Sequence, residues 1–216
     1  MKGKTNIVFA LTALVALAFQ PAALGWQPKL DNTFAKLDPN QPRYRDPWPL
    51  IALPIGCDKL LSRDCPVTSS DPDPIIGELS YITDGDKEHD AASYVELAPG
   101  LQWIQIDLGT EKEIHAICMW HYHGEPRVYR DVIVQISNDP DFEEGVVTVF
   151  NNDHDNSAKL GKGKDLSYIE TIYGRPFSVD AVKGRYVRCY SRGSTSNEMN
   201  HYTEVEIFGR HLQPEK

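Results

Sequence analysis

The sequence predicts an all-β fold, an antiparallel jelly-roll β-sandwich with a Pro-rich N-terminal lead-in. Apolar and polar residues alternate in short runs, as where Val205 and Ile207 alternate with Glu204 and Glu206. Turn-forming residues separate these runs, and the runs contain no long helical stripe of apolar residues. Alternation with period two is typical of strands that bury one face, and a series of such strands favours a sandwich.

Residues 1–25 are predicted to be a secretory signal peptide. Two lysines precede an apolar run over residues 7–19, and the small residues Ala23 and Gly25 lie where a signal peptidase inspects the chain. As a helix the run would span about 20 Å, short of the roughly 30 Å hydrocarbon core of a bilayer, so a retained anchor is the weaker interpretation. We expect cleavage after Gly25, with Ala18 as the alternative, and a secreted or periplasmic protein.

The net charge of the chain limits the classes of partner that it is expected to bind. The formal net charge of the whole chain is −9, and it becomes −11 once the two lysines of the signal peptide are removed. A strongly acidic exported protein is a poor candidate for binding nucleic acid or anionic membranes. It can readily hold divalent cations through oxygen ligands.

Residues 26–59 form the predicted lead-in, because proline at this density resists regular helices and strand ladders. The predicted domain covers residues 60–210, and residues 211–216 form a C-terminal tail. Strands are expected, with turn signals between them, at residues 102–109, 113–123, 131–139, 145–150, 166–174, 184–193 and 203–209.

Four cysteines remain after cleavage, an even number that is compatible with two disulfides in an oxidising compartment. The short loop between Cys57 and Cys65 favours that pairing. Cys118 and Cys189 lie in strand-like runs, and they could equally pair or remain buried free thiols. No CxxC motif is present, so zinc and thioredoxin-like redox chemistry are not expected.

The strand order places four loops at one end of the sandwich. If consecutive strands run antiparallel, every second connection lies at the same end. The loops concerned are residues 84–101, 122–130, 151–165 and 192–202. The histidines in or beside these loops are His89, His121, His123, His154 and His201. Function on β-sandwiches usually sits in such grouped loops, so we expect the binding end here.

His121 and His123 are two residues apart on or just past a strand, so both would point to one side and could share a metal ion. The third ligand would be His154, Asp153 or His201. An HxH pair is a weak motif alone, and we favour the alternative in which these histidines hydrogen-bond neighbouring loops or a sugar. The stretch FNNDHDNS is not an EF-hand loop, because Ala158 and Lys164 stand where the glycine and the bidentate glutamate belong.

The grouped loops combine amides, carboxylates, imidazoles, an arginine and aromatic rings. This mixture suits a polyol, because sugar hydroxyls donate and accept hydrogen bonds while an aromatic face covers the apolar side of the ring. The candidate polar contacts are His121, His123, Arg127, Asn152, Asp153, His154 and His201. The candidate aromatic platforms are Trp120, Tyr122, Tyr129 and Tyr202. The alternative is that several of these groups join long loops to one another without a ligand.

Six stretches carry a resemblance to a known family. In order they are LLSRDCPVTSSDP, ITDGD, QWIQIDLG, DVIVQISND, RYVRCYSRG and TEVEIFG. Over residues 60–210 the chain resembles the discoidin, or coagulation factor 5/8 type C, domain, a galactose-binding-like jelly roll that many bacterial carbohydrate-binding modules share. The resemblance implies a non-catalytic domain that binds ligands through loops at one end of the sandwich.

The resemblance also implies a structural calcium ion at the DG turn and at the glutamate that begins the last strand. Its ligands here would be Asp84, Asp86 and Glu204. The alternative is that DGD is simply a favourable turn. The chain departs from the family in having no cysteine after Cys189, so the bridge that often ties the two ends is absent. Apolar spikes are not evident in the loops, and we therefore do not expect membrane phospholipid binding.

The sequence thus predicts a non-catalytic, exported carbohydrate-binding module whose partner is a glycan. A module for protein interaction or surface assembly is one alternative. A metal-dependent hydrolase that uses His121, His123 and His154 is the less favoured one.

Overall fold

The computed structural model describes residues 51–90 and 92–212. The predicted signal peptide, the lead-in up to residue 50 and residues 213–216 of the tail lie outside the described residues. Within the described residues, no helix is long and apolar enough to cross a membrane.

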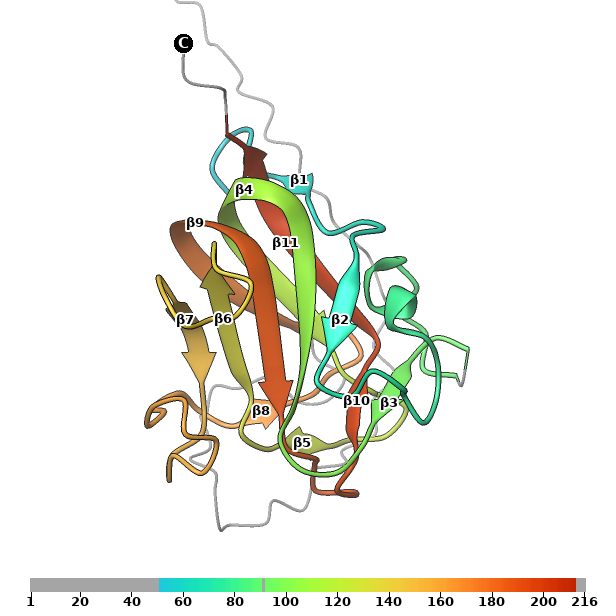
Figure 1. The fold of residues 1–216 in the computed structure, drawn as a ribbon. Coiled ribbons are helices and arrows are strands. Elements are labelled where there is room, and N and C mark those ends of the chain that lie inside the picture. The colour runs from blue at the N-terminus through green and yellow to red at the C-terminus, as the bar shows by residue number, and fades with distance from the viewer. Residues whose placement is uncertain (1–50, 91, 213–216) are drawn as a thin grey trace, which may run out of the picture.

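The centre of the fold is an antiparallel ribbon of two long strands. Strands β4 (Gln102–Trp120) and β9 (Arg175–Ser191) pair along nearly their whole lengths. The register shifts between Asp107 and Lys112, and the ribbon arches over at this point, at the top of Figure 1. Both open ends of the ribbon therefore lie at the opposite end of the molecule, and each strand contributes to both layers of the sandwich.

The remaining strands flank the two halves of this ribbon. The half that begins at Gln102 is flanked by β2 (Val67–Ser69) on one side and by β6 (Ile133–Ser137) and β7 (Val147–Asn151) on the other. The second half is flanked by β11 (Glu204–His211), which pairs in turn with β1 (Lys59–Leu60). All of these pairings are antiparallel, so the predicted all-β antiparallel sandwich is confirmed.

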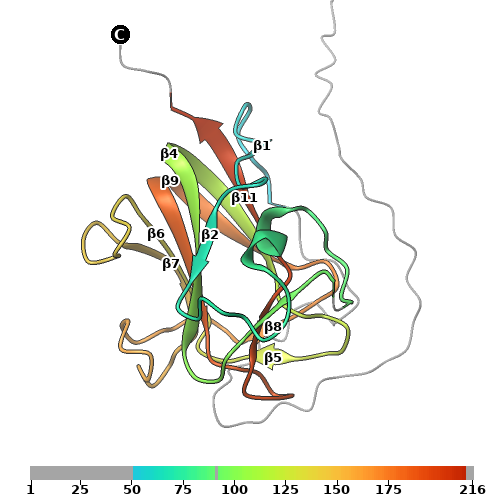
Figure 2. The same ribbon diagram turned by 45° about the vertical axis from the view of Figure 1, so that its right-hand side comes forward.

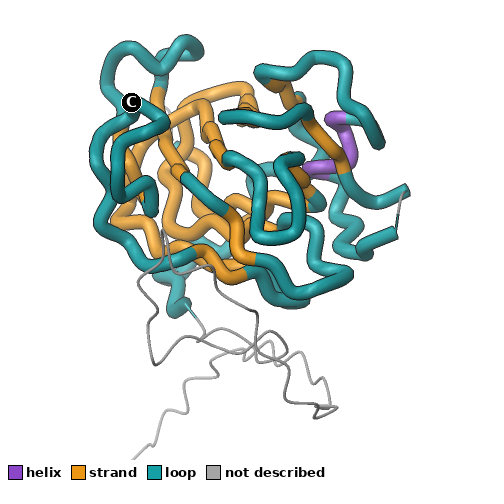
Figure 3. The backbone as a smooth tube through the Cα atoms, turned by 90° about the horizontal axis from the view of Figure 1, so that it is seen from below, coloured by secondary structure: helices purple, strands orange, loops and turns teal. Residues whose placement is uncertain are grey.

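Short strands build the end of the molecule that the ribbon leaves open. They are β3 (Val95–Leu97) paired with β10 (Asn200–Tyr202), and β5 (Val128–Tyr129) paired with β8 (Tyr168–Ile169). A 3-10 helix, η1 (Leu79–Thr83), lies beside β2 (Figure 2). Figure 3 looks onto this end and shows loops surrounding the strand ends, as the antiparallel order predicts.

The core lies between the two layers and follows the alternation of the sequence. Val134 and Ile136 of β6 pack with Val205 and Ile207 of β11 in one buried cluster. Ile133 points the other way and packs with Tyr190 and Ala158 on the outer face. Full burial of such a side chain contributes about 1.5–3 kcal/mol, so this alternation determines which face of each strand points inward.

The predicted disulfide between Cys57 and Cys65 is wrong, because all four cysteines are free thiols. For Cys118 and Cys189, the alternative of free thiols holds. The Cys65 thiol donates to the carbonyl oxygen of Leu61 at 3.3 Å. Cys118 and Cys189 lie in opposite halves of the bent ribbon, opposite Pro176 and Ile104 respectively. Burial raises the pKa of the Cys189 thiol to about 12. These thiols are therefore packing groups.

Replacement of Gly174 by alanine is expected to destabilise the protein by about 2–4 kcal/mol, because it combines overpacking with a left-handed backbone. Gly174 has a φ of +70°, and a Cβ there would lie 2.4–2.9 Å from three ring atoms of the buried Trp120. The matched control is Gly100→Ala, since Gly100 has a φ of +93° but open space around it. The control should lose only about 1–2 kcal/mol. Urea unfolding measures both, and equal losses would refute the packing argument.

Candidate functional site

Aromatic and charged side chains gather at the loop end of the sandwich. We call the group formed by Tyr94, Glu96, Tyr122, Glu125, Arg127 and His201 the Tyr122 cluster. Pairing of β3 with β10 places Glu96 directly opposite His201. Arg127 immediately precedes β5, and Tyr122 lies two residues after the end of β4. Both short sheets and the end of the central ribbon therefore fix the position of this cluster.

Tyr122 lies at the centre of the cluster. The ring of Tyr94 packs edge-on against it with centroids 5.0 Å apart, and the guanidinium of Arg127 lies 4.4 Å from its centroid. The phenol also packs over Gly124, where a Cβ would lie 2.5 Å from the Tyr122 hydroxyl. At the rim, the exposed His89 makes an edge contact with Tyr122 at 6.4 Å. The result is a partly exposed aromatic surface with a fixed cation against one face.

A chain of hydrogen bonds connects the charged members. His201 Nε2 donates to Glu96 Oε2 at 2.9 Å, and Arg127 Nη1 donates to His201 Nδ1 at 3.3 Å. Arg127 Nη2 and Nε donate to Glu125 Oε1 at 2.8 and 3.2 Å. Burial, and then the charge of Arg127, lowers the pKa of His201 to about 4. His201 is therefore neutral at neutral pH and transmits no positive charge to Glu96.

His121 and His123 do not form the metal pair that was the less favoured interpretation of the sequence. His121 is fully buried, with its ring stacked on Tyr129 at 4.1 Å and its Nδ1 3.4 Å from Glu170 Oε2. His123 is buried elsewhere, and its Nε2 lies 2.8 Å from the carbonyl oxygen of Lys87. Among the described residues, neither belongs to a group of three side chains whose ligand atoms lie together. Neither can touch a glycan at the surface.

Three predicted aromatic platforms are also buried. Tyr202 is fully buried, and its hydroxyl donates to the carbonyl oxygen of Cys189 at 3.1 Å. The Tyr129 hydroxyl donates to the carbonyl oxygen of Tyr122 at 3.3 Å, and Trp120 packs on Gly174. These rings belong to the core, so only Tyr122 of the predicted platforms lies where a ligand could reach it.

The loop over residues 151–165 is held together by its own polar groups. Asn152 Oδ1 accepts the Val132 N–H at 2.7 Å, and the carboxylate of Asp153 accepts backbone N–H groups of Ser157 and Ala158 at 3.1 and 2.8 Å. His154 Nε2 lies 2.7 Å from the carbonyl oxygen of Asp165. Prediction of Asn152 and Asp153 as ligand contacts is therefore wrong, since both are buried and engaged within the loop. His154 belongs to the same loop.

Two groups of possible metal ligands do occur among the described residues: Cys57, Glu113 and His115, and Asp131, Asp153 and Asp155. In the first, Glu113 is already paired with Arg210 at 2.8 Å. In the second, Arg192 lies 2.9 Å from Asp131, and Asp153 accepts the loop N–H groups. Protein donors thus already satisfy these carboxylates.

The DGD turn has oxygen donors that fit a hard cation. Glu204 Oε2 accepts the Gly85 N–H at 2.9 Å, and Glu204 is only 1% exposed. Burial raises the pKa of Glu204 to about 7. The carbonyl oxygen of Asp84 accepts a hydrogen bond from Arg63. The Asp86 carboxylate accepts from the Glu88 N–H and the Ser93 hydroxyl at 3.0 and 2.9 Å. Glu204 differs from Asp86 in being buried, so its charge has the greater need of a cation.

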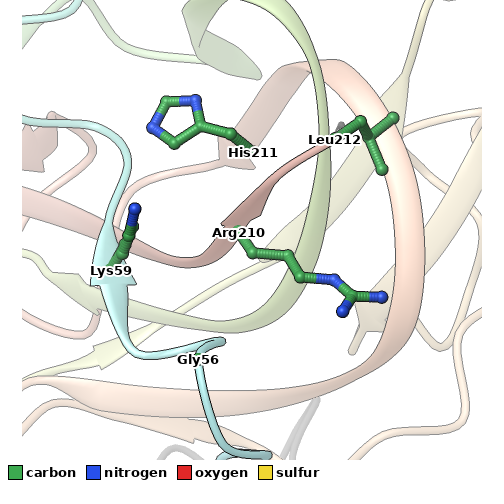
Figure 4. A pocket seen from close by; sticks show the side chains of 5 residues that line it. All are labelled: Gly56, Lys59, Arg210, His211 and Leu212. Atoms are coloured by element: carbon green, nitrogen blue, oxygen red, sulfur yellow. The ribbon is translucent and has the colours of Figure 1, made fainter. Parts of the chain in front are cut away.

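A cavity of about 330 Å³ lies at the opposite end of the sandwich, lined by Gly56, Lys59, Arg210, His211 and Leu212 (Figure 4). The guanidinium of Arg210 points away from the imidazole of His211 (Figure 4) and pairs with Glu113. The positively charged side chains that line this cavity therefore do not point toward one common position where a ligand could bind.

The sequence prediction did not include Tyr94, Glu96 and Glu125. Tyr94 and Glu96 lie in or beside a three-residue strand, which is too short to show a period. Glu125 stands two residues before Arg127, and this spacing of opposite charges in a turn could have predicted the ion pair between them.

Comparisons with known proteins give the fold. No protein-family model and no curated protein matches the chain. The solved CBM32 module of AlyQ, in complex with 4,5-unsaturated mannuronic acid, is 22% identical over 68% of this chain and 96% of that chain, with a TM-score of 0.51. A variant of chitosan-binding module 1 from a Paenibacillus chitosanase/glucanase is 19% identical over 70% and 99%, with a TM-score of 0.51.

A third similar structure is the F-lectin, or fucolectin, from striped bass (Morone saxatilis) serum. It is 18% identical over 74% of this chain and 51% of that chain, with a TM-score of 0.54. At these identities a likeness shows the fold. The chain therefore has the discoidin-like, galactose-binding-like jelly-roll fold that these binding modules and this lectin share.

Proposed function

We propose that this protein is a non-catalytic carbohydrate-binding module and that it binds glycan at the Tyr122 cluster. The carrying observation is the partly exposed Tyr94 and Tyr122 pair beside a hydrogen-bonded Glu96–His201–Arg127–Glu125 chain. An aromatic surface covers the apolar face of a sugar, and carboxylates accept from its hydroxyls. The names of the similar structures, a carbohydrate-binding module, a chitosan-binding module and a fucolectin, support this function.

We also propose that the protein is exported. The support is the apolar run over residues 7–19, with two lysines before it and small residues after it.

Replacement of Tyr122 by alanine is expected to weaken glycan binding by at least about tenfold, because it removes the ring and the support of Arg127. A glycan array with the chain from residue 26 would find the ligand, and titration calorimetry would measure the loss. The matched control is Phe142→Ala, since Phe142 packs on Arg188 in a loop at the other end of the sandwich. An empty array, or equal affinity in the Tyr122 variant, would count against this function.

We further propose that a calcium ion binds at the DGD turn, with Glu204 and the Asp84 carbonyl as ligands, and stabilises the loop end. A buried carboxylate is costly unless a cation offsets its charge, and Glu204 is such a group. Arg63 donates to the same carbonyl, so the ion would displace this guanidinium.

A further inference from the structure

The rim of the Tyr122 cluster carries an excess of carboxylates. Glu88 and Asp90 flank the rim residue His89 and are exposed, and Glu96 and Glu125 belong to the cluster itself. Among the described residues, the lysine and arginine ion pairs near the rim involve Glu206, Glu125 and Glu198, and Glu96 is paired with His201. A ligand that reaches this rim therefore meets a negative potential.

The nearby cations are already paired with protein carboxylates. Lys87 Nζ lies 2.7 Å from Glu206, and Arg130 Nη1 lies 3.4 Å from Glu198. Arg127 uses Nε and Nη2 on Glu125 and Nη1 on His201, and its side chain is only 8% exposed. An acidic sugar would find no ready partner in Arg127, because all three nitrogens of this buried guanidinium already donate to protein groups.

Acceptors, by contrast, remain open at both ends of the hydrogen-bonded chain. Glu96 uses Oε2 on His201, and Glu125 uses Oε1 on Arg127 and Ser196. The second oxygen of each carboxylate accepts no hydrogen bond from the described residues. The Glu125 side chain is 54% exposed and that of Glu96 is 16% exposed. Burial, and then the charge of Glu96, raises the pKa of Tyr94, and Glu125 is held by the Arg127 that lies against the Tyr122 ring. Both carboxylates therefore belong to the surroundings of aromatic rings, whose faces attract cations.

We propose that the glycan bound at the Tyr122 cluster carries a protonated amine, as in an oligosaccharide of unsubstituted amino sugars. This inference rests on the proposed carbohydrate binding at the same site. An ammonium group supplies three donors and no acceptor, which matches two open carboxylate oxygens beside aromatic faces. A neutral N-acetylated sugar offers one amide N–H and no charge, and a uronate adds repulsion from the rim.

The test compares glucosamine oligomers with their fully N-acetylated counterparts and with uronate oligomers of equal length. Titration calorimetry at about pH 5.5 keeps the amine protonated. We expect the glucosamine oligomer to bind at least about tenfold more tightly than either of the others, with a preference that shrinks as salt is added. Equal or tighter binding of the acetylated or uronate oligomer overturns the amine assignment and leaves carbohydrate binding intact. Absence of binding to every glycan overturns both.

Glu96→Gln is expected to weaken binding of the glucosamine oligomer much more than binding of the acetylated oligomer, and so to remove most of the preference for the amine. Glu125→Gln is the second variant, and it tests the other end of the chain in case one substitution disturbs the fold. The control is Glu143→Gln, an exposed glutamate in the β6–β7 loop. A loss that is equal for both oligomers in both variants would mean that the carboxylates only hold the loops, and it would overturn the proposal.

Discussion

Glu170→Gln is expected to stabilise the protein most at pH 8 and to flatten the fall in stability that the native chain shows as pH rises from about 5. Glu170 is fully buried, and burial raises its pKa to about 8 from an ordinary value of 4.5. The folded state thus keeps a proton that the unfolded chain releases. The contribution of Glu170 to the free energy of unfolding is fully present below the pKa of the unfolded chain, and it is lost as pH rises toward the pKa of the folded protein. A shift of this size corresponds to roughly 5 kcal/mol between the two limits.

Burial outweighs the groups around Glu170 that favour its ionised form, which include hydrogen bonds and the charge of Arg175, and so raises its pKa. His121 lies 3.4 Å away, but burial lowers the pKa of His121 well below its usual value, so the imidazole stays neutral. Tyr168 also faces Glu170, and its own pKa is raised by burial. The Glu170 carboxyl accepts the backbone N–H groups of His121 and Thr171 at 3.0 and 3.1 Å. In the glutamine variant the carbonyl oxygen can replace Oε1 as acceptor of the Thr171 N–H. The amide then stands in the place of Oε2, where it can donate to His121 Nδ1 but no longer accepts the His121 N–H.

Urea unfolding at intervals between pH 5 and 8 measures this effect, with Glu143→Gln as the exposed control. The native chain and the control should lose stability in parallel, while Glu170→Gln loses much less. A remaining slope is expected from Glu204, whose pKa burial raises to about 7. Identical slopes for all three proteins would show that Glu170 is ionised at little cost in the folded state.

The alternation of apolar residues was sufficient to predict the sandwich. It assigned β6 and β11 correctly, because Val134, Ile136, Val205 and Ile207 all point into one core. Because consecutive strands are antiparallel, the prediction that the loops gather at one end also holds. What the pattern could not show is that β4 and β9 each continue through a bend. In β9 the bend includes Ala181 in a left-handed conformation, with a φ of +51°. Alanine rarely adopts this conformation, so the sequence does not predict the bend there.

The candidate site was predicted less well than the fold. Tyr122 and Arg127 belong to the Tyr122 cluster, and their role as ligand contacts stays a prediction, whereas His121, Tyr129 and Tyr202 are core residues. The residues on either side of a histidine do not show whether its side chain is buried or exposed. Which of two successive residues faces the core depends on the pleat of the strand before them, and at Trp120 the strand ends.

Calcium is expected to raise the melting temperature of the protein more at pH 8 than at pH 5. Glu204 binds a cation only when ionised, and burial raises its pKa to about 7. Without the ion, the stability contribution of Glu204 is full below its unfolded pKa of about 4.5 and is lost as pH rises through 7. The ion replaces the proton, so its effect grows over the same range. At a free calcium concentration of 1,000 times Kd, the stabilisation is about 4 kcal/mol.

Two variants separate this binding from a general salt effect. Glu204→Gln should abolish the response to calcium, because the amide lacks the charge that holds the ion. Arg63→Ala should strengthen the response, since Arg63 donates to the Asp84 carbonyl that the ion needs. The matched arginine control is Arg185→Ala, which removes an ion pair with Asp107 elsewhere on the surface. An unchanged melting temperature when metal-loaded protein is transferred into chelator would exclude the ion. Arg63 would then be the cation that balances the Glu204 end of the turn, and Arg63→Ala would lower stability whether or not calcium is present.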